Sequence, residues 1–237
     1  MILGINTSTL QFSLALMNNR GCLVGEIYLS TGKRHFGGLF PSLDFLLHSL
    51  DKRISDITCV AVALGPGSFT GLRVGLSSAK GLAHALDVPI VGINSLEALA
   101  IQVPHSSLPI TALIESRRND VFVAQFHWTS KSRLTRTGED QCLEYESLKG
   151  QITLPSIFVG NNYETQYPKL KESIPTGMNF APSHSWSVKA SSVCSLGLRR
   201  FLDGELDDMA TLVPIYLRPP DIRANPYFQR EGIASQR

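Results

Sequence analysis

The sequence predicts an α/β protein with two lobes. Residues 1–104 alternate apolar runs of strand length with segments of helical periodicity, in the order β-β-β-α-β-α-β-α. After the polar stretch His105–Pro109, a shorter and less regular set of strands begins again. The 237 residues suffice for two such lobes, each with its own core. We therefore expect a first lobe at 1–104, a smaller second lobe at 105–218 and an irregular tail at 219–237, whose return onto the first lobe is left open.

The first lobe should begin with an antiparallel meander. Three apolar runs, separated by short polar turns, have strand length: Met1–Asn6, Phe12–Met17 and Leu23–Leu29. The turn Asn18–Gly21 has the composition of a hairpin.

Two helices should follow the meander. Apolar residues recur at steps of three and four over Lys33–Leu50, and Pro41 should kink that helix because it has no N–H to donate. The apolar run Ile57–Leu64 is typical of a buried parallel strand. A glycine-rich turn then leads into a helix over Phe69–Leu86.

The remaining elements are expected at lower regularity. Pro89–Ile93 should be a buried strand, and Ser95 should cap a helix over Leu96–Val103. In the second half we expect three strands and one helix, at Ile110–Ile114, Val121–Trp128, Ile157–Gly160 and Val188–Leu202. Duplicated lobes of this order resemble the architecture of actin, hexokinase and the heat-shock ATPases.

The composition fits a folded protein of the cell interior. Hydrophobic residues make up 43% of the chain and charged residues 18%, as in globular proteins. The formal net charge of +2 neither requires nor excludes a polyanionic partner. The sequence has no apolar run long enough for a membrane span, and its first residues lack the features of a signal peptide. We therefore expect a cytoplasmic protein without a membrane partner.

The densest motif is the glycine-rich segment Gly65–Gly75, between a buried strand and a helix. Phosphates often bind to free N–H groups at such a place. However, Gly71 is followed by Leu72 where a P-loop has lysine, and Thr70 stands where a dinucleotide fingerprint has its third glycine. A tight turn in which Ser68 or Thr70 caps the helix is therefore the favoured interpretation. The weak candidates for nucleotide binding are Gly65, Gly67, Ser68 and Thr70.

The helix behind this turn carries a row of small residues at steps of four: Gly71, Gly75, Ala79 and Ala83. A glycine inside a helix costs about 1 kcal/mol relative to alanine. Such a row therefore suggests that another backbone approaches closely. The pattern leaves open whether that backbone belongs to the protein's own sheet or to a second chain.

The sequence shows no catalytic or metal-binding constellation. The six histidines form no HxxxH pair, and there is no GxSxG motif. The segment Glu115–Arg118 follows a strand, and Arg117–Arg136 forms a modest basic patch that is compatible with a nucleic-acid contact. The four cysteines have no zinc-binding spacing and are expected to be reduced thiols: Cys22, Cys59, Cys142 and Cys194.

The segment Gly65–Gly75, followed by Ala79–Ala83, closely resembles the signature of the bacterial TsaB (YeaZ) family. Four further segments are similar to other parts of that family: Ile2–Thr9, Asn94–Ala100, Ile114–Arg118 and Pro214–Arg218. The resemblance implies the actin-like (ASKHA) fold with a reduced second lobe. It also implies a non-catalytic role in forming threonylcarbamoyladenosine beside the anticodon of tRNAs that read codons beginning with A.

The resemblance also implies partners. The catalytic subunit of this family's enzyme is the paralogue TsaD, which carries a metal-binding HxxxH. The ATPase TsaE joins the complex, and tRNA is reached through it. The family pairs with TsaD, or with itself as a homodimer, through its first two helices. We therefore expect no intrinsic cofactor, with ATP or ADP bound only within the complex, and a partner interface that comprises Phe36, Leu39, Phe40, Leu43, Gly71, Gly75, Ala79, Leu82 and Ala83.

Three departures from the family pattern bear on function. Asn6 stands where the family normally has Asp, and a carboxylate at that place helps to hold a nucleotide's metal in active members of the wider fold. Glu115-Ser116 replaces Asp-Ala, and His35-Phe36 replaces His-Ser. An ATP-dependent small-molecule kinase is the alternative function, but it would need an acid at position 6 and a Gly-Gly loop where Gly160-Asn161 stands. A metalloprotease is disfavoured because the metal-binding histidines are missing.

Overall fold

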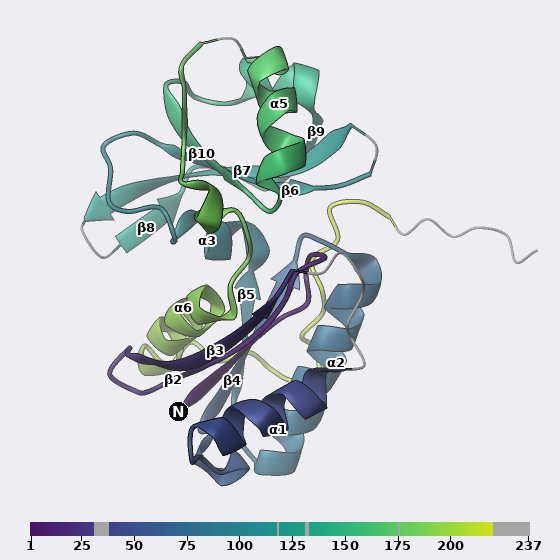
Figure 1. The fold of residues 1–237 in the computed structure, drawn as a ribbon, viewed down its shortest axis with the longest axis vertical. Coiled ribbons are helices and arrows are strands. Elements are labelled where there is room, and N and C mark those ends of the chain that lie inside the picture. Colours follow the sequence, from purple (N-terminus) through teal and green to yellow (C-terminus); the bar gives the residue numbers. More distant parts are fainter. Residues whose placement is uncertain (31–37, 118, 131–132, 175, 220–237) are drawn as a thin grey trace, which may run out of the picture.

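The computed structural model describes residues 1–30, 38–117, 119–130, 133–174 and 176–219. Two sheets lie end to end, and each has helices packed against it (Figure 1). The first sheet has the strand order β3-β2-β1-β4-β5. Its strands are β1 (Ile2–Asn6), β2 (Phe12–Met17), β3 (Leu23–Leu29), β4 (Cys59–Gly65) and β5 (Ile90–Asn94). The expected antiparallel meander and the two parallel strands are thereby confirmed.

Helices cover both faces of the first sheet. Helices α1 (Leu39–Ser49) and α2 (Phe69–Leu86) pack on one face, and α6 (Ala190–Leu202) packs on the other (Figure 1). Successive side chains of β1 point to opposite faces of the sheet. Leu3 lies in the core beneath α1 and α2, and Ile2 lies in the core beneath α6.

Helix α1 differs from its sequence prediction. It begins at Leu39, so Pro41 is its third residue. The N–H groups of the first turn have no partner inside a helix, so proline is tolerated there and the reason for the expected kink does not apply. Residues 33–37, including Phe36, lie outside the described residues.

The next two helices have well-defined caps. Helix α2 begins after Ser68, whose side chain accepts a hydrogen bond from the Gly71 N–H, as one of the two predicted caps would. Helix α3 (Ser95–Ala100) is capped by Asn94 and not by Ser95. Asn94 Oδ1 accepts from the N–H groups of Leu96 and Glu97, which moves the cap one residue earlier than the sequence suggested.

The second sheet has the order β11-β10-β6-β7-β8, with β9 paired to β7. Strands β6 (Ile110–Glu115), β7 (Asp120–Ser130) and β10 (Ser156–Gly160) match the sequence prediction. The prediction missed short or polar elements, whose periodicity is weak. These are β8 (Arg133–Arg136), β9 (Gln141–Glu144), β11 (Met178–Phe180), α4 (Leu148–Gln151), α5 (Tyr163–Ser173) and the 3-10 turns η2 (Ile54–Asp56), η3 (Tyr145–Ser147) and η4 (Ser183–Ser185).

The chain returns to the first lobe at α6, which differs from the expected second lobe of residues 105–218. Helix α6 packs against β1, β2 and β4 of the first sheet. Asp207 forms a β-bridge with Ile90, and the Ile215 N–H donates to the Leu64 carbonyl at 2.8 Å. The physical reason is a close fit, because a side chain at Gly4 would meet the carbonyl oxygen of Ala190 at 2.5 Å. The face of the sheet is thus shaped for this helix.

Side chains from the sheet hold the start of α6. Its N-cap, Lys189, makes no side-chain cap hydrogen bond. Instead, the Glu26 carboxylate accepts from the Ser191 N–H at 2.9 Å and from the Ser191 hydroxyl at 2.8 Å. Ser13 Oγ accepts from the Ala190 N–H at 2.9 Å. Residues of β2 and β3 therefore replace the missing local cap.

Replacing Glu26 with alanine should remove both hydrogen bonds to Ser191 and lower the free energy of unfolding by about 1–2 kcal/mol. Urea unfolding measures this change. Glu172→Ala, on the exposed surface of α5, is the matched control and should leave the midpoint unchanged. Equal midpoints for the two variants would contradict the capping role.

Candidate functional site

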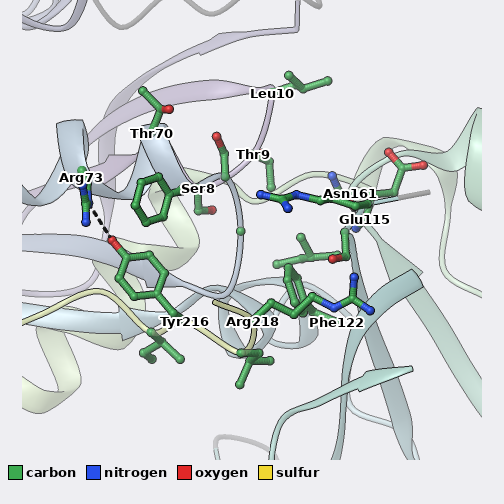
Figure 2. Close-up of a pocket in the computed structure, with 18 of the residues that line it drawn as sticks. Ser8, Thr9, Leu10, Thr70, Arg73, Glu115, Phe122, Asn161, Tyr216 and Arg218 are labelled. Atoms are coloured by element: carbon green, nitrogen blue, oxygen red, sulfur yellow. Dashed lines mark hydrogen bonds between the residues drawn. The ribbon is translucent and has the colours of Figure 1, made fainter. Parts of the chain in front are cut away.

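A cavity of about 690 Å³ lies between the two lobes (Figure 2). This volume is in the range of small-ligand sites. The first lobe contributes the turn Ser8–Leu10 and the start of α2, and the second lobe contributes the end of β6. The segment Ile215–Pro219, which we call the C-terminal strap, forms another wall.

The glycine-rich turn is shaped by the protein's own backbone. Gly65 has φ +116°, and a side chain there would meet the Ile215 carbonyl oxygen at 2.7 Å. A side chain at Gly67 would overlap the Ser8 carbonyl oxygen, and the Ser68 N–H donates to that oxygen at 2.7 Å. Internal packing therefore accounts for both glycines. Nucleotide binding by these residues and Thr70 stays a prediction, although Gly67, Ser68 and Thr70 do line the cavity.

Asn6, at the end of β1, is completely buried. Its Oδ1 accepts from the Ser8 N–H at 3.0 Å and from the Ser8 hydroxyl at 2.7 Å. Its Nδ2 donates to the Val188 carbonyl at 2.8 Å. An ionised aspartate could not make this last bond, since a carboxylate only accepts hydrogen bonds. The amide therefore links β1 to the segment that leads into α6.

The C-terminal strap contacts both lobes. The Tyr216 ring lies 5.2 Å from the Phe69 ring, and Arg73 Nε donates to the Tyr216 hydroxyl at 3.1 Å. Arg73 also lies 4.0 Å above the Phe69 ring, in cation-π geometry. At the other end of the strap, Arg218 forms an ion pair with Asp120 of β7. The sequence marked this segment only as similar to a family motif.

The segment Glu115–Arg118, which follows β6, lies partly at this cavity. Glu115, Ser116 and Arg117 line the cavity, and the Glu115 N–H donates to Asn161 Oδ1 at 2.8 Å. The Glu115 carboxylate accepts from the hydroxyl of Thr165. Arg118 lies outside the described residues.

The basic patch expected over Arg117–Arg136 is not one surface. Arg133 lines a different cavity, of about 800 Å³, together with residues of β5, α3 and α6. Arg136 forms an ion pair with Asp140 and so is compensated within the chain. At this second cavity, burial raises the pKa of the Glu97 carboxyl against the opposing effect of nearby arginines. Arg117 precedes β7 whereas Arg133 and Arg136 lie on β8, so the length of the β7–β8 hairpin separates them.

The expected partner interface needs correction. A side chain at Gly75 would overlap Thr7 Oγ1, and that hydroxyl donates to the Gly71 carbonyl at 2.7 Å. Ala79 and Ala83 are fully buried against the first sheet. The remaining buried members of the predicted set are Gly71, Leu39, Leu43 and Leu82. The row of small residues therefore permits close packing on the protein's own sheet, where these side chains are covered within the chain.

Among the described residues, the outer face of the same two helices is exposed. Phe40 is 54% exposed and Phe45 is 65% exposed, both on α1. On α2, a side chain at Gly81 would have no atom within 4 Å. Phe45 is not among the interface residues expected from the sequence, because it falls outside the apolar periodicity of this helix.

Comparisons with known proteins agree with this geometry. The family model described as TsaD, tRNA N6-adenosine threonylcarbamoyltransferase, matches residues 27–195, which is more than half of the chain.

The chain belongs to this family.

Its relatives include the tRNA threonylcarbamoyladenosine biosynthesis protein TsaB of Bacillus subtilis, at 27% identity over 94% of this chain and 96% of that protein. The Escherichia coli protein of the same name is 26% identical over 92% of this chain and 94% of its own length. The solved structure of YeaZ from Pseudomonas aeruginosa covers 91% of this chain and 99% of that chain, with a TM-score of 0.73 and 23% identity. The resemblance to the TsaB (YeaZ) family and the two-lobed actin-like fold are thereby confirmed.

In the ranges that the structure describes, no helix is both long and apolar enough to cross a membrane. Within those same ranges, no group of three or more His, Cys, Asp or Glu side chains is arranged to hold a metal ion.

Replacing Asn6 with aspartate should lower the free energy of unfolding by about 1–3 kcal/mol at pH 7, because the new carboxylate would face the Val188 carbonyl oxygen. Burial should raise the pKa of this new carboxyl in the folded state. Stability should then fall as the pH rises through that pKa, so the deficit should be smallest near pH 4. Chemical unfolding at several pH values tests this, with exposed Asn19→Asp as the control. A deficit independent of pH would contradict it.

Two glycine substitutions in α2 should have opposite effects. Gly75→Ala should lower the free energy of unfolding by about 1–3 kcal/mol, since the new methyl group would displace Thr7. Gly81→Ala, in open space, should raise it by about 0.5–1 kcal/mol. Thermal melts of both variants decide the matter. A stabilised Gly75→Ala variant would show that the row does not face the protein's own sheet.

Proposed function

We propose that this protein is the non-catalytic partner subunit of a cytoplasmic, TsaD-type enzyme. That enzyme would form threonylcarbamoyladenosine next to the anticodon of tRNAs that read codons beginning with A. The match to two proteins named for threonylcarbamoyladenosine biosynthesis, along more than nine-tenths of the chain, supports the pathway.

The observation that carries the non-catalytic role is the engagement of Asn6. Its amide uses hydrogen bonds to Ser8 and Val188, at the place where a carboxylate would help to hold a nucleotide's metal. The Ser68 N–H, at the start of α2, is likewise used by the Ser8 carbonyl. These groups serve the fold, so the chemistry belongs to another chain. The kinase alternative has less support, because it depends on the same groups.

The outer face of α1 and α2 supports docking of that other chain. Phe40 and Phe45 expose aromatic area on α1, and aromatic residues are typical anchors of protein interfaces. The open space at Gly81 allows a partner to approach α2 closely. This face would bind the TsaD paralogue, or a second copy of this chain when TsaD is absent. TsaE and ATP or ADP would join in the assembled complex, in which the tRNA is modified.

In a reconstituted reaction with TsaD, TsaE, tRNA and a donor of the threonylcarbamoyl group, the modified nucleoside should form only when this subunit is present. The purified chain by itself should hydrolyse ATP at no more than the background rate. Mass spectrometry of tRNA digests and phosphate release measure the two outcomes. Full modification without the subunit would refute its role as a partner.

Replacing Phe45 with alanine should weaken binding to TsaD about tenfold or more, which corresponds to about 1.4 kcal/mol. The melting temperature should not change, because Phe45 is 65% exposed. Calorimetric titration measures the affinity. Leu202→Ala, 64% exposed on α6 at the opposite face of the sheet, is the matched control and should bind as the unaltered chain does. Equal affinities for both variants would place the interface elsewhere.

A further inference from the structure

The interlobe cavity combines positive charge with aromatic rings. The described residues of its lining include three arginines, Arg73, Arg117 and Arg218, and one acidic residue, Glu115. It also contains the rings of Phe69, Phe122 and Tyr216. Guanidinium groups bind phosphates, and aromatic faces stack on nucleobases. The cavity therefore has the chemistry of a nucleotide-containing ligand.

Three of these groups form a stack at one end of the cavity. Arg73 lies 4.0 Å from the centre of the Phe69 ring and donates to the Tyr216 hydroxyl, and the two rings are 5.2 Å apart. Tyr216 is 39% exposed, so part of its ring is available to a ligand. Figure 2 shows Arg73 and Tyr216 on one side of the cavity, and Arg218, Glu115 and Asn161 on the other.

The stack is held in place by the fold. The Ile215 N–H binds the Leu64 carbonyl next to Tyr216, and Arg218 binds Asp120 of the second lobe. A surface that is already ordered loses little conformational entropy when a ligand binds. Arg218 has five N–H donors, so its ion pair leaves donors for a phosphate.

A free nucleoside triphosphate fits this cavity poorly. The Ser68 N–H at the start of α2 already binds Ser8, and Asn6 supplies an amide where a metal would need a carboxylate. A single-stranded nucleic acid needs neither a free N–H at Ser68 nor a carboxylate at position 6. Aromatic side chains stack on its bases, and individual basic side chains contact its phosphates.

We propose that the interlobe cavity binds a short single-stranded segment of RNA. Bases stack at the Phe69–Tyr216–Arg73 platform, and backbone phosphates contact Arg117 and Arg218 on the opposite wall. The inference rests on the proposed function, since it makes the unpaired part of the tRNA substrate the ligand of this subunit.

The test uses the isolated full chain and three probes: a fluorescent single-stranded RNA of about ten nucleotides, an RNA duplex of the same composition, and ATP. Anisotropy should show saturable binding of the single strand, weaker binding of the duplex, and no competition by ATP at equal concentration. Tyr216→Ala should weaken binding of the single strand about tenfold. Tyr216→Phe, which keeps the ring, should bind normally. Arg117→Gln should lower the slope of log affinity against log salt concentration by about one.

Tyr28 provides the matched control, because it is also 39% exposed but lies on β3, away from the cavity. Tyr28→Ala should bind RNA as the unaltered chain does. Melting temperatures exclude unfolding as the cause of any loss.

Absence of RNA binding, equal binding by Tyr216→Ala, or displacement of the RNA by ATP would each overturn the proposal. The proposed function is tested separately, with the Tyr216→Ala variant in the reconstituted complex. If that complex forms and modifies tRNA although the variant has lost RNA binding, the proposed function stands without the RNA site.

Discussion

The structure depends on one set of polar contacts, at the point where the chain returns from the second lobe to the first. Asn6 holds the Val188 carbonyl, Ser13 holds the Ala190 N–H, and Glu26 holds Ser191. The groups come from three adjacent strands and satisfy the start of a helix that has no local cap. Without them, the orphan N–H groups of α6 would be buried unpaired, at a cost of about 1–3 kcal/mol each.

Placement of α6 has consequences for both lobes. The helix covers the face of the first sheet that α1 and α2 leave open, and its core is continuous through α3 with that of the second sheet. It also directs the following residues back along β5, where Asp207 bridges Ile90. The C-terminal strap then reaches the interlobe cavity and joins the lobes through Tyr216 and Arg218. One wall of the cavity therefore exists because the chain returns to the first lobe at α6.

Close approach of other parts of the chain accounts for three glycines of the most characteristic motif. Gly65 and Gly67 admit the carbonyl groups of Ile215 and Ser8, and Gly75 admits Thr7. The motif thus joins three parts of the chain that are distant in sequence. The motif is rich in glycine because several segments of the chain pack against it. The outer side of α1, by contrast, exposes Phe40 and Phe45 among the described residues.

The local pattern of the sequence determined most of the first lobe. Its five strands and the bounds of α2 follow from apolar runs and helical spacing, which are properties of neighbouring residues. The resemblance of the glycine-rich motif also identified the family. Tertiary structure alone decided which side of α2 is buried, since a row such as Gly75 and Ala79 fits its own sheet and a foreign helix equally well. It alone decided the capping of α6 by Glu26, 165 positions earlier in the chain, and the meeting of Tyr216 with Phe69. Hydrogen bonds and stacking between distant residues leave no periodic trace in the sequence, because they depend on where the folded backbone brings the two partners together.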